Sequence, residues 1–270
     1  MEQCLCRARR QLPTFSYTLP PMITLQNVRK KFGDAEVLRG VSFEVRPNEF
    51  VCITGPSGAG KTTLMHLLIG AETTTSGSVH VDDVDLRQVP PRALQLYRRR
   101  VGFVFQDYKL LWDRTVAENI AFPLEICGAK DSVIEKRVTE ILEQMQLVQH
   151  ANVLCHALSG GEKARTAIGR AIVHKPMIVL ADEPTGNLDP EESMKVLKLF
   201  KDIHQRGATV ILATHDTMIV DALRTRVIHL KNGVVIRDSV GKYDDREQQP
   251  SEEKDDQGKK RSVKIISTSK

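Results

Sequence analysis

The chain has 270 residues, of which 41% are hydrophobic, 27% charged and 5% aromatic, and its net charge is +5. This composition is typical of a soluble globular protein and excludes a chain that stays disordered throughout. No apolar run reaches the roughly 20 residues of a membrane-spanning helix, and the small excess of positive charge argues against nucleic-acid binding. The five scattered cysteines are typical of a reducing compartment.

Strand-like segments follow one another from Met22 onward. Residues 1–21 end in a proline-containing break and are expected to be a flexible extension, unless Met22 is the true start. Apolar runs predict strands at 23–28, 41–45, 49–54, 177–181 and 209–213. Two more strands flank Lys231-Asn232-Gly233, whose Asn-Gly pair predicts a tight hairpin turn. Helical patterns between the runs indicate a mainly parallel sheet.

Two helices are predicted in the middle of the chain. Thr115 and Glu118 are spaced as a capping box for the first, which Pro123 should break or kink. Asp131-Ser132 offers an N-cap for the second, whose apolar residues share one face over 134–145.

A further helix is predicted to begin at Asp189. Asp189 suits the N-cap position, Pro190 suits the first turn, and Gly207 ends the pattern. From residue 243 the composition changes to charged and polar residues, so the tail 243–270 is expected to be disordered.

Residues 55–63 match the phosphate-loop pattern between an apolar strand and an amphipathic segment. The glycines let successive backbone N–H groups face a bound anion at a helix N-terminus. The Lys61 ammonium can reach the β- and γ-phosphates of a nucleotide, and the Thr62 hydroxyl can ligate Mg²⁺. The predicted nucleotide-binding residues are Gly55, Pro56, Ser57, Gly58, Ala59, Gly60, Lys61, Thr62 and Thr63.

Two further segments carry suitable chemistry. Asp182-Glu183 ends a buried run, where one carboxylate can hold Mg²⁺ and the other can orient or deprotonate a water. Ser159-Gly160-Gly161 opens a helix and offers a second anion-binding end, although the first loop already accounts for the phosphates of one nucleotide. A capped helix without a ligand is the alternative for this second segment.

The order of these segments resembles an ABC-type ATPase subunit over about residues 22–240. The matching segments are Gly55–Thr63, Gln106, Leu158–Gly161, Asp182-Glu183, Gly186–Asp189 and His215. The resemblance implies an α/β P-loop NTPase fold with a mainly parallel central sheet, an antiparallel β subdomain and an α-helical subdomain at about 107–165, within a nucleotide-binding domain at 22–242. It also implies an ATP-dependent, head-to-tail homodimer, in which Ser159–Gly161 of one subunit contacts ATP on the phosphate loop of the other.

The resemblance further implies roles for single residues. Phe32 would stack on adenine, with a core phenylalanine as the alternative. Glu183 would be the general base, Gln106 would touch Mg²⁺ and the attacking water, and His215 would contact the γ-phosphate. The implied Mg²⁺ ligands are Thr62, Gln106 and Asp182.

Residues 101–119 resemble the cell-division subgroup of the family. That resemblance implies a transmembrane partner, FtsX, through which ATP turnover controls cell-wall hydrolases, and a peripheral location at the cytoplasmic face of the plasma membrane. Division-ring proteins are further candidate partners. The apolar and aromatic cluster Tyr108, Leu110, Leu111 and Trp112 is a candidate docking surface, although packing within the chain is the alternative for both leucines.

Two other functions stay open. Related ATPases of lipoprotein-release and macrolide-export complexes share Leu110-Leu111 and the Thr115 helix start. A division scaffold that binds ATP, with turnover secondary, is the other alternative.

Overall fold

The computed structural model describes residues 20–240. The expected flexible extension and the charged tail therefore lie outside the described residues, apart from residues 20 and 21. Within residues 20–240, none of the helices combines the length and the apolar character of a membrane span.

A six-stranded sheet forms the centre of the molecule, in the order β10-β9-β3-β8-β7-β6. Its strands are β3 (Phe50–Thr54), β6 (Val101–Val104), β7 (Ile178–Asp182), β8 (Thr209–Thr214), β9 (Arg226–Lys231) and β10 (Val234–Val240). All neighbouring pairs are parallel except β9 and β10, so the predicted mainly parallel sheet is confirmed. Because parallel strands end at one edge, the residues that follow β3, β6, β7 and β8 lie along the same side of the sheet.

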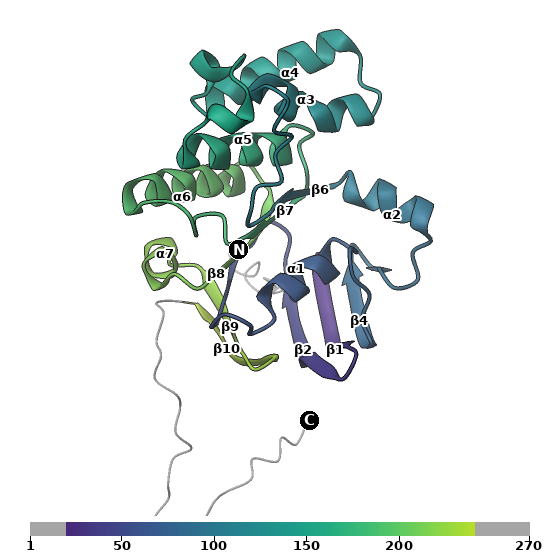
Figure 1. Cartoon of the computed structure of the whole chain (residues 1–270). Coiled ribbons are helices and arrows are strands. Elements are labelled where there is room, and N and C mark those ends of the chain that lie inside the picture. Colours follow the sequence, from purple (N-terminus) through teal and green to yellow (C-terminus); the bar gives the residue numbers. More distant parts are fainter. Residues whose placement is uncertain (1–19, 241–270) are drawn as a thin grey trace, which may run out of the picture.

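A smaller antiparallel sheet has the order β2-β1-β4-β5. Its strands are β1 (Ile23–Phe32), β2 (Ala35–Val45), β4 (Ser76–Val81) and β5 (Val84–Asp85). Figure 1 shows this sheet beside α1 (Lys61–Leu68) and at the opposite end of the molecule from α3 (Val116–Ile126) and α4 (Asp131–Gln144). The antiparallel β part of the predicted fold is therefore present.

Seven α-helices and two short 3₁₀ helices complete the described part of the chain. They are α1 (Lys61–Leu68), α2 (Pro91–Arg98), α3 (Val116–Ile126), α4 (Asp131–Gln144), η1 (Val148–His150), η2 (Cys155–Ala157), α5 (Gly160–Ile172), α6 (Pro190–Gln205) and α7 (Thr217–Leu223). Figure 1 shows α3, α4 and α5 together as a helical lobe above the central sheet.

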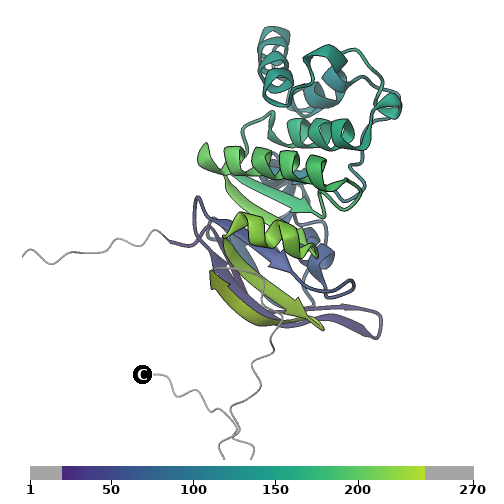
Figure 2. The ribbon, with the colours of Figure 1, turned by 90° about the vertical axis from the view of Figure 1, so that its left-hand side faces the viewer.

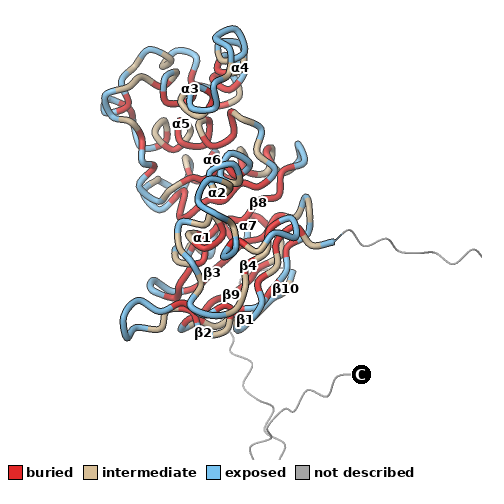
Figure 3. Tube along the Cα trace, turned by 90° about the vertical axis from the view of Figure 1, so that its right-hand side faces the viewer, coloured by how far each residue is buried: buried red, intermediate tan, exposed pale blue. Residues whose placement is uncertain are grey.

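Side chains of the central sheet alternate between two cores. Phe50 and Cys52 of β3 pack in one cluster with α5, α6 and α7, whereas Val51 and Ile53 pack in the other with α1 and the smaller sheet. Figure 2 shows α6 and α7 on one side of the sheet strands. Figure 3 shows β3 and β8 buried throughout, in contrast to the exposed outer side of α4. Because both faces of the central sheet are covered, the site residues lie at the edge where its parallel strands end.

Two of the three predicted helix caps are present. The Thr115 hydroxyl accepts a hydrogen bond from Glu118 N at 3.2 Å, and Glu118 Oε2 accepts one from Thr115 N at 2.7 Å, which is the predicted capping box. The Asp189 side chain caps α6 by accepting from the backbone N–H three residues later. The predicted cap at Asp131-Ser132 is wrong: Lys130 occupies the N-cap position without a side-chain hydrogen bond, and Asp131 is already helical.

Two predictions about chain breaks have opposite outcomes. Pro123 is predicted to break or kink α3; it lies inside the helix, which continues to Ile126, so the predicted break is wrong. Proline removes only one donor from the helix, and the ladder resumes where Cys127 N donates to Pro123 O at 3.2 Å. The predicted hairpin turn is confirmed, because Asn232 and Gly233 both have positive φ, at 51° and 78°.

Candidate functional site

The phosphate loop connects β3 to α1 at the edge of the central sheet. Gly55 has φ 147°, and a Cβ there would collide with the Leu230 carbonyl, so no other residue fits without a shift. Gly60 has φ 105° and is the N-cap of α1, which begins at Lys61. The loop therefore ends in a helix N-terminus, where backbone N–H groups and the helix dipole favour an anion.

Lys61, Glu183 and His215 form a line of contacts at this edge. Lys61 Nζ lies 3.3 Å from Glu183 Oε1 and donates to the carbonyls of Gly55 at 2.8 Å and Pro56 at 3.3 Å. The same Glu183 oxygen lies 2.9 Å from His215 Nδ1. Lys61 and Glu183 are 6% and 7% exposed, so the two charges interact in a largely desolvated place.

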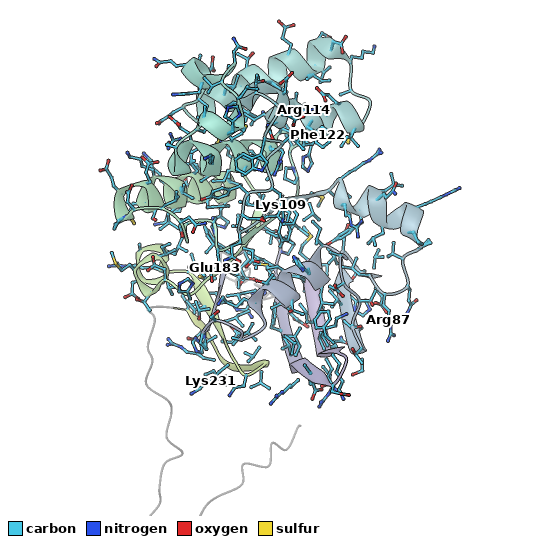
Figure 4. The ribbon with its side chains drawn as sticks, viewed as in Figure 1. Arg87, Lys109, Arg114, Phe122, Glu183 and Lys231 are labelled. Atoms are coloured by element: carbon cyan, nitrogen blue, oxygen red, sulfur yellow. The ribbon has the colours of Figure 1, made fainter. Side chains whose placement is uncertain are left out.

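Glu183 is held by the backbone as well as by these side chains. Its N–H donates to the Ala213 carbonyl of β8 at 2.9 Å, and its φ is 46°. A non-glycine residue with positive φ is strained, and such strain concentrates at functional sites. Figure 4 shows Glu183 near the middle of the molecule, below Lys109, Arg114 and Phe122.

Asp182 has the features of a cation ligand. It is 2% exposed, and its Oδ1 atom has no hydrogen-bond partner. Burial raises the pKa of its carboxyl above the ordinary value, while a hydrogen bond with the Thr62 side chain opposes the rise. A divalent cation beside Thr62 would satisfy the unpaired oxygen, so these residues fit Mg²⁺.

The protein supplies only part of such a cation site. Within residues 20–240, no group of three or more His, Cys, Asp or Glu side chains could hold a metal by itself. The remaining ligands would therefore come from water and from the phosphates of the nucleotide.

Gln106 and Phe32 lie on different elements. Gln106 is exposed two residues after the end of β6, the strand next to β7, so it lies beyond the same sheet edge as Asp182. Phe32 ends β1 with 47% of its surface exposed, which rules out the alternative of a core phenylalanine. The Lys30 ammonium lies 4.6 Å from the centre of its ring.

The Ser159 loop, which we define as Ser159–Gly161, begins α5 in the helical lobe. Ser159 caps the helix through a capping box with Glu162, and both Ser159 and Gly160 are exposed, whereas Gly161 is buried. In residues 20–240, no hydrogen bond or ion pair joins this loop to the phosphate loop of the same chain. The two helix N-termini that the sequence predicts to bind anions are thus separate within the chain.

Two residues of the predicted docking cluster, Tyr108 and Leu110, are buried, so the prediction of an exposed docking surface is wrong for them. Tyr108 is 6% exposed, with its hydroxyl 3.5 Å from the Pro184 carbonyl, and Leu110 is 4% exposed, because both side chains pack in the core beneath α5. Leu111 is half-buried. Trp112 is 49% exposed, with Lys163 Nζ 5.5 Å from its ring centre.

A groove that no sequence pattern predicted lies between α2, α3 and β6. Its volume is about 610 Å³. Phe105, Phe122 and Ile126 contribute apolar surface, and Arg99 and Lys109 contribute positive charge. Leu111, from the predicted cluster, also lines it. The lining residues fall in two separate parts of the chain, 95–127 and 170–174, so only the fold brings them together.

The phosphate loop at a parallel sheet edge, with a buried carboxylate pair and a histidine beside it, defines a P-loop ATPase. The chain belongs to the ABC transporter family, whose model matches residues 38–186. It is 44% identical over 224 residues to the cell division ATP-binding protein FtsE of Bacillus subtilis, covering 82% of this chain and 98% of that protein. It is 45% identical to FtsE of Mycobacterium tuberculosis, covering 80% and 95% of the two chains.

Solved structures give the same assignment. A dimeric ATP-binding cassette in a post-hydrolysis state, bound to ADP and Pi, superimposes with a TM-score of 0.75 at 34% identity, covering 81% of this chain and 98% of that chain. The predicted α/β P-loop fold of the ABC type and the resemblance to the cell-division subgroup are confirmed. The chain is an ATP-binding enzyme that hydrolyses ATP.

Proposed function

We propose that this chain is the ATPase subunit of a membrane complex of the FtsE–FtsX kind, acting in cell division. The observation that carries the proposal is its similarity to FtsE over 98% of that protein's length, combined with the Lys61–Glu183–His215 contacts. In this function, residues 22–242 form the nucleotide-binding domain. A transmembrane partner similar to FtsX keeps the subunit at the cytoplasmic face of the plasma membrane and transmits its cycle to cell-wall hydrolases.

The contacts support the following proposed roles in hydrolysis. Residues 55–63 hold the phosphates through backbone N–H groups, and the Lys61 ammonium contacts the β- and γ-phosphates. Glu183 takes a proton from water as the water oxygen bonds to the γ-phosphorus and the bond to the β-phosphate oxygen breaks. His215, whose Nδ1 lies 2.9 Å from Glu183 Oε1, fixes that carboxylate and reaches the γ-phosphate. Phe32 presents its exposed ring to adenine.

Mg²⁺ would be held by Thr62, Asp182 and Gln106. The unpaired Asp182 Oδ1 atom supports this assignment. The bound ion neutralises charge on the phosphates during transfer. Gln106, exposed after β6, also contacts the attacking water and links this site to the partner.

A head-to-tail homodimer explains the two separate anion-binding ends. In this dimer, Ser159, Gly160 and Gly161 of one subunit contact the ATP on the phosphate loop of the other. The exposure of Ser159 and Gly160, and the dimeric cassettes with TM-scores of 0.75, support this arrangement.

The groove between α2, α3 and β6 is the proposed docking surface for the membrane partner. The groove replaces Tyr108 and Leu110 as the candidate docking surface, because both of these side chains are buried. Apolar surface at Phe122 and Ile126 beside the cations Arg99 and Lys109 fits an amphipathic segment that carries acidic side chains. Leu111 belongs to this surface, and the exposed Trp112 is a separate candidate contact.

Replacement of Glu183 tests the function. Glu183→Gln should keep ATP binding, stop turnover and trap the dimer, and cells that depend on this variant should fail to divide. Lys61→Ala should lose ATP binding and also fail. The variant Glu140→Gln is the matched control and should support normal division, because Glu140 is exposed and its ion pair with Arg137 lies away from the residues of the proposed site.

The outcomes separate the competing functions. If cells divide normally with Glu183→Gln but fail with Lys61→Ala, ATP binding is needed and turnover is not. That result would favour an ATP-dependent scaffold over a subunit whose ATP turnover acts on a membrane partner. Copurification with a four-helix membrane protein that has one extracellular domain supports the FtsX-like partner. Copurification with a lipoprotein-release permease would overturn it.

A further inference from the structure

The first turns of α5 and α6 meet at the side chain of Glu192. Arg165 Nη1 of α5 lies 2.6 Å from Glu192 Oε2, with side-chain exposures of only 16% and 24%. The other carboxylate oxygen, Oε1, accepts from Lys195 Nζ at 2.9 Å. The hydrogen bonds from Lys195 and Arg165 hold the pKa of the Glu192 carboxyl below its ordinary value. Glu192 is thus a fixed anion between two helices.

The Ser159 loop rests directly on this carboxylate. A Cβ placed on Gly161 would overlap it, since the Glu192 Cδ atom would lie only 2.8 Å away. A Cβ on Gly160 would lie 3.3 Å from Leu188 Cδ2 and 3.6 Å from the Asn187 carbonyl oxygen. A side chain at position 161 would therefore have to displace the Glu192 carboxylate.

The segment beneath the Ser159 loop is hydrogen-bonded to the backbone of Glu183. We define the Asp189 loop as Gly186–Asp189. At its start, Gly186 N donates to the Glu183 carbonyl at 3.2 Å, and at its end Asp189 Oδ1 accepts from Glu192 N at 2.9 Å. The Asp189 loop consequently joins Glu183 to Glu192 with a hydrogen bond at each end.

We propose that Glu192 is a positioning residue that makes the Ser159 loop and the Asp189 loop move as one unit. The state of Glu183 in one subunit would then set the position of the Ser159 loop that the same subunit presents to ATP on a second copy of this chain. This inference rests on the proposed dimer. Its consequence is that the two ATP sites of the dimer act cooperatively, through a charge-assisted link inside each subunit.

Glu192→Ala in the full chain tests the link. Wild-type ATPase activity plotted against ATP concentration should give a Hill coefficient approaching two, because there are two coupled sites. Glu192→Ala should lower this value toward one and weaken ATP-dependent dimerisation by about threefold to thirtyfold. The affinity of the dilute monomer for a fluorescent ATP analogue should stay within about twofold, since no contact of Lys61 is altered.

Three further variants separate positioning from a general loss of structure. Glu192→Gln keeps an acceptor for Arg165 and should be intermediate. Lys195→Ala is the matched control: it removes the more exposed partner of the same carboxylate and should leave the Hill coefficient unchanged. Arg165→Gln removes the ion pair from the α5 side and should lower the Hill coefficient and weaken dimerisation as Glu192→Ala does. If Glu192→Ala does not fold, Arg165→Gln still tests the proposal.

Two results would overturn the proposal. One is an unchanged Hill coefficient in folded Glu192→Ala and Arg165→Gln proteins. The other is a parallel loss of thermal stability, monomer nucleotide binding and activity, as expected of a purely structural contact. An absence of ATP-dependent dimers in the wild type would overturn the proposed dimer as well, so the two failures are distinguishable.

Discussion

Replacing Asp182 by asparagine should make the protein more stable and inactive at the same time. Asp182 is 2% exposed, and its Oδ1 atom lacks a hydrogen-bond partner. Burial is the largest influence on this carboxyl and raises its pKa, so the charged form is less favourable in this position than in water. Asparagine has nearly the same shape and carries no charge to desolvate.

The expected size of the stability gain follows from this burial. A buried unsatisfied polar group costs about 1–3 kcal/mol, and a charged one costs more. Asparagine still leaves one atom without a partner but removes the charge, so the net gain should be about 1 kcal/mol. For a domain of this size, that gain raises the midpoint of thermal unfolding by about 2–4 °C. Hydrolysis should fall at least about a hundredfold, because the proposed Mg²⁺ ligand is lost.

The assay is thermal unfolding of the purified chain without nucleotide or magnesium, alongside steady-state ATPase activity. Asp83→Asn is a suitable control, because Asp83 is exposed and asparagine tolerates its φ of 60°. It should change the midpoint by less than about 1 °C. A midpoint for Asp182→Asn that is unchanged or lower than that of the wild type would refute the reasoning from the unpaired oxygen.

Three other substitutions have defined outcomes. Phe32→Ala should weaken ATP binding about five- to hundredfold in a binding titration with little change in stability, and Phe32→Tyr should bind ATP as the wild type does; equal binding by all three would contradict the stacking role. Thr115→Ala should lower the unfolding midpoint by about 2–4 °C through loss of the cap of α3, and Thr115→Ser should restore it. Gly55→Ala should cost more than about 2 kcal/mol in denaturant unfolding, because of its φ and the Leu230 carbonyl; a wild-type denaturation curve would show that the loop can relax.

Local signals in the sequence were enough to place most of the site. The phosphate loop, the carboxylates at the end of β7 and the caps at Thr115 and Asp189 each depend on residues within a few positions of one another. The hairpin at Asn232-Gly233 was equally predictable, because two adjacent residues must both adopt positive φ.

The errors arose where distant residues decide the outcome. Tyr108 and Leu110 resemble an exposed aromatic cluster in sequence, but the packing of α5 over them makes them part of the core. Pro123 stays within α3 because one missing donor costs less than the packing of the helix gains. The Arg165–Glu192 pair spans 27 residues and has no sequence pattern, so only the fold could reveal it.

Chemical labelling of a cysteine can test the proposed docking of a partner in the groove. Cys52 is fully buried, and burial with the nearby Glu183 charge raises its pKa to about 12; burial also raises the pKa of Cys155. Cys127 is exposed and lines the groove, so within the described residues it is the accessible thiol. Once Cys4 and Cys6 are replaced by serine, a thiol-reactive fluorophore would label Cys127 alone. Its emission would then report when a partner covers this surface and when ATP turnover releases it.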